Sequence, residues 1–186
     1  MKDIEFIREY LNRYQKSLLE NDVSDYMISM KKLLLQTRDK GNKVLIAGNG
    51  GSAAMASHVS VDLTKQAGIR TVNFNEADLI TCFANDYGYE NWVAKAIEFY
   101  GDKGDVAILI SSSGKSPNMI NAAIQAKSMN ITVITLTGFE QDNRLRKFGE
   151  LNFWVDSKSY NVIENIHQIW LLMVCDLILG KIEYSA

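Results

Sequence analysis

The sequence predicts an α/β protein of three layers, in which helices cover both faces of a parallel sheet. Short apolar segments such as 44–47 and the DVAILIS run at 105–111 are typical of strands that are buried on both faces. Such segments alternate with helical ones, which favours right-handed crossovers between parallel strands. We therefore expect a five-stranded parallel sheet, preceded by two helices and followed by one long helix.

Two helices are expected in the first forty residues. Apolar residues recur at helical spacing over 4–18 and again over 26–34. Asn21 and Asp22 form a break between the two helices, and Gly41 suits the C′ position of the second. These helices could pack against a partner subunit or cover their own sheet, and the pattern leaves both interpretations open.

The remaining elements follow in alternation. Strands are expected at 44–47, 69–74, 105–111, 131–137 and 151–155. Helices are expected after the first strand and at 75–83, 90–100, 117–129, 141–148 and 160–181. The 186 residues are 47% hydrophobic and show no linker, so we expect one domain over 1–186, with a helical segment at 1–40 and an α/β core at 41–186.

Composition narrows the range of partners. Twenty basic and 22 acidic residues give a net charge of −2, which provides no basic surface for nucleic acid or an anionic membrane. The charged N-terminus has no signal-peptide core, and no apolar run is expected to reach transmembrane length. Cys82 and Cys175 lie in apolar segments and are interpreted as buried thiols. The expected protein is cytoplasmic, with small molecules or proteins as partners.

The first strand leads into a glycine-rich turn, GNGGS at 48–52. Its glycines let the backbone approach a ligand closely, and Asn49 and Ser52 can hydrogen-bond that ligand at the start of a helix. The turn lacks the third spaced glycine of a dinucleotide site and the lysine of a nucleotide P-loop. An anion site and a simple tight connection are both compatible with this pattern.

A second turn, SSSGKSP at 111–117, follows the third strand. Gly114 permits the turn, and Pro117 suits the first position of the next helix. A common helix start would explain Ser116 and Pro117, but the density of hydroxyls favours an anion site. Without a lysine at the nucleotide position, the site suits a sugar phosphate. The hydroxyls belong to Ser111, Ser112, Ser113 and Ser116.

With these two turns, the sequence resembles the sugar isomerase (SIS) domain and, within it, the phosphoheptose isomerase group. The resemblance rests on GNGGSAA and His58, the A-N-D and Y-G of 84–88, the serine turn, VITLTG at 133–138 and the I-E-N-I-H of the last helix. It implies a flavodoxin-like fold and a homotetramer with sites between subunits. The implied reaction converts sedoheptulose 7-phosphate to D-glycero-D-manno-heptose 7-phosphate.

The resemblance also implies which residues bind the substrate. The four serines would hold the phosphate, while Asn49, Ser52 and Asp86 match positions that line the sugar. Gly50 and Gly51 of the glycine turn complete the expected substrate-binding set.

The chain departs from the family at three positions. Asp62 stands where the family has a glutamate, Glu164 where it has a glutamine, and Leu172 where it has a histidine. Asp62 and Glu164 are therefore the expected catalytic residues. Some members bind zinc at these positions, so His58, Asp62 and Glu164 are the candidate zinc ligands. Plain interpretations remain open, since His58 could be a buried structural histidine, Asp62 could face solvent, and Glu164 could stabilise its helix.

Two functions follow. The first is an aldose–ketose isomerase acting through a cis-enediol, in which repulsion between Asp62 and Glu164 raises one pKa and leaves one acid and one base. The second, suggested by Leu172, is a catalytically silent SIS module that binds a phosphosugar or a protein partner.

Overall fold

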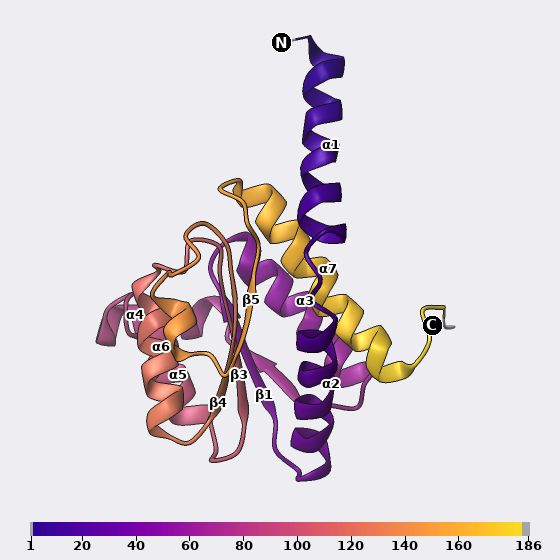
Figure 1. The fold of residues 1–186 in the computed structure, drawn as a ribbon. Coiled ribbons are helices and arrows are strands. Elements are labelled where there is room, and N and C mark those ends of the chain that lie inside the picture. The colour runs from indigo at the N-terminus through magenta and orange to yellow at the C-terminus, as the bar shows by residue number, and fades with distance from the viewer. Residues whose placement is uncertain (1, 184–186) are drawn as a thin grey trace.

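The computed structural model describes residues 2–183 and contains one parallel sheet flanked by helices (Figure 1). Every strand pair is parallel, and the order across the sheet is β2-β1-β3-β4-β5. This confirms the predicted α/β class and the five-stranded parallel sheet. The strands are β1 (Val44–Gly48), β2 (Thr71–Asn73), β3 (Val106–Ser111), β4 (Thr132–Thr137) and β5 (Leu151–Trp154).

Alternate strand residues feed two separate apolar cores, one on each face of the sheet. In β1, Val44 and Ile46 pack into the core on one face, while Leu45 and Ala47 pack into the core on the other. The first face is covered by α2 (Ser24–Asp39), α3 (Gly51–Lys65) and α7 (Tyr160–Leu179). The second is covered by α5 (Trp92–Tyr100) and α6 (Pro117–Ser128), with α4 (Ala77–Tyr87) beside α5. The predicted three layers are therefore present.

The turn signals place most helix ends correctly. Gly41 follows α2 at the C′ position with a φ of +73°, and Pro117 is the first residue of α6. The predicted helix at 141–148 is wrong for most of its length, because only Leu145–Phe148 forms a short 3₁₀ turn. Asn143 is buried there, and its side-chain amide donates to Thr137 Oγ1 and to the Glu140 carbonyl, which stabilises a non-helical turn.

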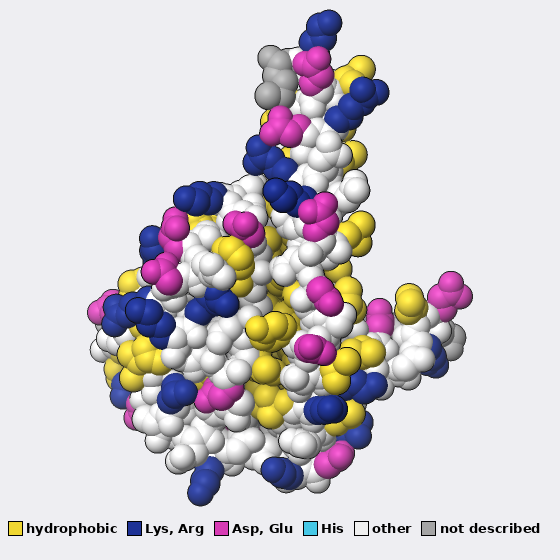
Figure 2. Space-filling view, viewed as in Figure 1, with side chains coloured by type: hydrophobic (Ala, Val, Ile, Leu, Met, Phe, Trp, Pro, Cys, Tyr) yellow, Lys and Arg dark blue, Asp and Glu magenta, His cyan; other side chains and the backbone are white. Residues whose placement is uncertain are grey.

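Helix α1 (Asp3–Leu19) projects from the body of the domain (Figure 1). None of its residues is buried, and Figure 2 shows hydrophobic side chains along it. Its second half contacts α7, where Asn165 Nδ2 donates to Tyr14 Oη at 2.7 Å. Helix α2 covers the sheet, but α1 does not. Its exposed apolar residues are Ile4, Phe6, Ile7, Leu11 and Leu19.

Helix α7 corrects one expectation from the sequence. Its 20 residues are long and apolar enough to cross a membrane by length and composition, although no such segment was expected. In the fold, α7 packs against α1, α2 and α3, and Trp170 and Val174 are fully buried in the core. This packing accounts for its apolar composition.

Candidate functional site

The two predicted turns meet at the point where the strand order reverses. Strand β1 lies between β2 and β3, and Gly48 at its end pairs with Ile110 of β3. In open parallel sheets of this order, ligands bind outside the carboxyl ends of the strands at this reversal. The glycine turn and the serine turn therefore lie side by side at the expected binding edge.

The serine turn is held by its own hydrogen bonds. Ser111 Oγ donates to Ser116 Oγ at 3.1 Å, and the Lys115 amide donates to Ser113 Oγ at 3.2 Å. Ser116 stands at the N-cap of α6 as predicted, but its hydroxyl bonds Ser111 and not the helix backbone. Ser112 Oγ is buried and has no partner among residues 2–183. A bound anion would supply the missing acceptor.

The glycine turn requires glycine at two positions for different reasons. Gly50 has a φ of +57° and a ψ of −122° and precedes the first turn of α3. Gly51 lies against the carboxylate of Glu164 on α7, so that a Cβ at this position would displace that carboxylate. Helix α7 thus brings Glu164 directly over the N-terminus of α3.

These elements enclose a cavity of about 110 Å³. Burial raises the pKa of the Glu164 carboxyl above its usual value. The cavity therefore combines hydroxyl groups, a half-buried carboxyl group and the first turns of two helices, whose amides and dipoles favour anions. Its lining residues are Asn49, Ser52, Ile110, Ser111, Ser112, Ser113, Ser116, Tyr160 and Glu164.

Three expected substrate residues are not among the residues that line this cavity: Gly50 and Gly51, which lie beside it in the glycine turn, and Asp86. Asp86 is exposed on α4, where Asn85 Nδ2 donates to its Oδ1 at 2.9 Å. The Sγ of Cys82 lies 3.8 Å from its Oδ2. Cys82 is itself exposed, contrary to its interpretation as a buried thiol, whereas Cys175 is buried.

The structure adds residues that the sequence interpretation missed. Asn49 and Asn118 exchange two side-chain hydrogen bonds, and Tyr89 Oη donates to Asn49 Oδ1 at 3.2 Å. Tyr160, the first residue of α7, lines the cavity and packs on Phe139. Asn118 directly follows Pro117 at the start of a helix that faces the expected anion site. This position in the sequence could have identified Asn118 as a candidate site residue.

The two expected catalytic carboxylates do not meet within one chain. Asp62 follows Gly51 by eleven residues on α3, which places it about 16 Å along the helix from Gly51, the residue that contacts the Glu164 carboxylate. From the sequence, repulsion by Asp62 is expected to raise one of the two pKa values. The pKa of Glu164 is raised by burial instead. Asp62 instead lies near Cys175, whose pKa is raised to about 12 by burial and by the nearby carboxylates of Asp62 and Asp176.

His58 lies between α3 and α7 and contacts Asp62. Its Nε2 is 3.4 Å from Asp62 Oδ2, and its Nδ1 is 3.2 Å from Gln168 Nε2. The His58 side chain is 56% exposed, so it is not the buried structural histidine of the plain interpretation. His167 is fully buried and contacts the Thr137 carbonyl through Nε2 at 3.0 Å.

The candidate zinc ligands do not form a metal site within one chain. Across residues 2–183, no three His, Cys, Asp or Glu side chains are grouped closely enough to hold a metal ion. Glu164 lines the cavity of about 110 Å³ between the two turns, called the phosphate-type cavity below, while His58 and Asp62 lie two to three turns beyond Gly51 on α3. The fourth family position is Leu172, which supplies no ligand atom and packs against the core.

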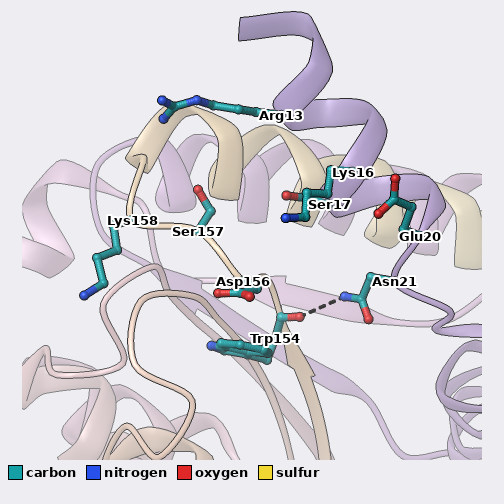
Figure 3. Close-up of a pocket in the computed structure, with 9 residues that line it drawn as sticks. All are labelled: Arg13, Lys16, Ser17, Glu20, Asn21, Trp154, Asp156, Ser157 and Lys158. Carbon is teal, nitrogen blue, oxygen red and sulfur yellow. Dashed lines mark hydrogen bonds between the residues drawn. The ribbon is translucent and has the colours of Figure 1, made fainter. Parts of the chain in front are cut away.

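A larger cavity of about 500 Å³ lies between α1 and the segment after β5 (Figure 3). Asn21 Nδ2 donates to the Trp154 carbonyl at 3.1 Å on its floor, and charged side chains of both signs form its rim. It contains none of the predicted site residues and no cluster of hydroxyls, so the smaller cavity is the better candidate. Its lining residues are Arg13, Lys16, Ser17, Glu20, Asn21, Trp154, Asp156, Ser157 and Lys158.

The fold is that of an α/β protein with a parallel sheet, and its hydroxyl-lined cavity at the strand reversal is typical of a ligand-binding protein of this class. Comparison with known sequences gives the family. The SIS domain family model matches residues 6–138. The chain belongs to the SIS domain family.

Several of its relatives within this family are named phosphoheptose isomerases. One from Fusobacterium nucleatum is 35% identical over 149 residues, which cover 77% of this chain and 74% of the relative. One from Helicobacter pylori is 32% identical over 172 residues, covering 88% and 89% of the two chains. The solved structure of a phosphoheptose isomerase from Francisella tularensis is 25% identical, with a TM-score of 0.89 over 97% of this chain and 100% of that one. The chain thus falls in the phosphoheptose isomerase group, as its motifs had indicated.

Proposed function

We propose that this chain is an aldose–ketose isomerase that converts sedoheptulose 7-phosphate to D-glycero-D-manno-heptose 7-phosphate. The observation that supports this most directly is the single cavity shared by the serine hydroxyls and the Glu164 carboxyl. The hydroxyls and helix amides would hold the phosphate without a lysine or arginine. Anchoring that end fixes the distance from the carboxyl to the sugar carbons.

Glu164 is the proton carrier in this proposal. An enediol mechanism needs one group that removes a proton beside the carbonyl and returns it to the neighbouring carbon. Burial raises the pKa of Glu164 toward the working pH, which suits a carboxyl that must take up and release a proton. Asn49, fixed by Asn118 and Tyr89, would contact the sugar hydroxyls.

The site also requires a second copy of the chain. A cavity of about 110 Å³ has room for a phosphate group but falls below the roughly 300 Å³ of typical small-molecule sites. The sugar would therefore extend beyond it, where a neighbouring copy could add contacts. We propose a homotetramer in the cytoplasm. The apolar stripe of α1, which is the set of exposed apolar residues given above for this helix, would lie at a subunit interface. Asp62 and Asp86 would reach the sugar from a neighbouring copy.

A binding module without activity is the second candidate, and Leu172 favours it. Leu172 stands at the position where the motif resemblance places a catalytic histidine, and it packs against the core. On this alternative, the cavity would bind a phosphosugar, and no proton transfer would follow.

Glu164→Gln separates the two functions. If Glu164 carries the proton, the variant should lose turnover of sedoheptulose 7-phosphate by about 10²-fold while its affinity stays nearly the same. Product formation by NMR and binding by calorimetry give the two readouts. Unchanged turnover would remove Glu164 from the mechanism, and no turnover in the parent protein would favour the binding module.

A further inference from the structure

Gln168 is a polar residue of α7 that does not line the phosphate-type cavity. It lies about one turn after Glu164 and one turn before Leu172. Its amide Nε2 is 3.2 Å from His58 Nδ1, and the other ring nitrogen of His58 is 3.4 Å from Asp62 Oδ2. A line of three polar side chains therefore connects α7 to the Asp62 carboxylate on α3.

The direction of these contacts indicates the position of a proton. The Gln168 amide nitrogen faces Nδ1, and an amide nitrogen only donates, so with the amide in this orientation His58 Nδ1 accepts the hydrogen bond and carries no proton. A neutral imidazole has one N–H, which is then on Nε2 and faces Asp62. Gln168 thus selects the tautomer that presents a donor to the carboxylate.

We propose that Gln168 is a positioning residue for the isomerase reaction, which holds His58 as the Nε2–H tautomer and thereby orients Asp62. The functional part of this inference rests on the function proposed above. His58 is 56% exposed and Asp62 23%, so without a restraint from α7 the imidazole would be free to rotate. Leu172 cannot supply that restraint because its side chain has no polar atom.

The same arrangement opposes zinc binding by His58. A zinc ion is bound through the lone pair of a ring nitrogen, and here the Nδ1 lone pair accepts from Gln168 while Nε2 carries the proton. Zinc could bind only if this hydrogen bond broke or the proton left. Both ring nitrogens of His58, the histidine at a position where some relatives bind the metal, are therefore engaged by side chains of this chain.

The tautomer can be read directly by NMR. The chain has two histidines, so labelling with ¹⁵N-histidine gives two imidazoles, and His58→Ala identifies which is which. At pH 8 we expect a proton on Nε2 of His58 and none on Nδ1. In Gln168→Glu, a carboxylate that can only accept should move the proton onto Nδ1. A proton on Nδ1 in the parent protein, or the same tautomer in both proteins, would overturn the inference.

Kinetics test the consequence for the reaction. Gln168→Leu should lower kcat by about 10-fold or more with KM within about threefold, since the phosphate contacts are intact. Gln36→Leu, at an exposed glutamine on α2, is the matched control and should leave both constants unchanged. An unchanged kcat in Gln168→Leu would contradict a positioning role.

Zinc titration into chelator-treated protein provides a third readout. We expect no stoichiometric binding by calorimetry and no shift of the His58 nitrogens. Stoichiometric binding with a shift at His58 would overturn the inference. If the protein turns over no heptose phosphate, the proposed function fails, while the NMR and zinc results still decide the state of His58.

Discussion

The side-chain amides of Asn49 and Asn118 exchange two hydrogen bonds, in which Asn49 Nδ2 donates at 3.0 Å and Asn118 Nδ2 donates at 2.8 Å. This pair joins the end of β1 to the start of α6. It fixes the amide of the glycine turn beside the serine turn, although the two residues are 69 positions apart in sequence.

Removing Asn118 should loosen this junction. We expect Asn118→Ala to lower the free energy of unfolding by about 1–3 kcal/mol, because the half-buried Asn49 loses both hydrogen bonds to the buried Asn118. Affinity for the phosphosugar should fall as well. Asn121→Ala, on the same helix, also loses hydrogen bonds but lies outside the cavity, so it should lose stability and keep affinity. Equal affinities in the two variants, measured by calorimetry, would remove Asn49 from the sugar site.

The serine turn should carry the phosphate. Replacing Ser113 and Ser116 together with alanine is expected to weaken phosphosugar binding by about 2–4 kcal/mol, if each hydroxyl makes a charge-assisted hydrogen bond. Ser128→Ala, at the opposite end of α6, is the control and should bind normally. Calorimetry with wild-type affinity in the double variant would place the phosphate elsewhere.

The buried imidazole of His167 should make the free energy of unfolding depend on pH. Burial lowers its pKa to about 4, from an ordinary value near 6.5. Between these values the unfolded chain takes up a proton that the folded chain refuses, so stability is full above about pH 6.5 and falls as the pH drops toward 4. This loss should amount to about 3 kcal/mol and level off below pH 4 for this group.

Urea unfolding between pH 7 and pH 4 gives the measurement. His167→Gln should be less stable at pH 7 but should show a smaller loss of stability on acidification. His58→Ala serves as the control, because that side chain is largely exposed. The same pH dependence in parent and His167→Gln would contradict a buried, neutral His167.

The exposed stripe of α1 should form a subunit interface. Light scattering of the parent protein is expected to give a mass about four times that of the 20.9 kDa chain. Ile7→Asp with Leu11→Asp should lower this mass by placing charges in the apolar stripe. Asn12→Asp, which adds a charge at a polar position of the same helix, should not. A mass near that of one chain for the parent would contradict a site completed by a second copy.

The sequence was sufficient for the sheet and for both turns, because these depend on local signals. The apolar run at 105–111 is typical of a buried strand, and glycines mark the turns where the backbone approaches a ligand. The helix expected at 141–148 was wrong, because the buried Asn143 side chain satisfies a competing turn. That interaction depends on Thr137, which local periodicity does not reveal.

The carboxylates illustrate a different limit. Motif matching placed Asp62 and Glu164 in one site, but the register of α3 against α7 decides which residues face each other. The contact of Gly51 with Glu164 and of His58 with Gln168 fixes that register. It results from packing between helices more than one hundred residues apart, so it had to be read from the structure.

Proton exchange tests the central claim most directly. The parent protein is incubated with sedoheptulose 7-phosphate in deuterated water, and the substrate and product are followed by NMR. An enediol intermediate formed by a carboxyl group predicts deuterium at the carbon beside the carbonyl, together with formation of the aldose phosphate. Binding of the phosphosugar with neither deuterium incorporation nor aldose formation would contradict the isomerase function.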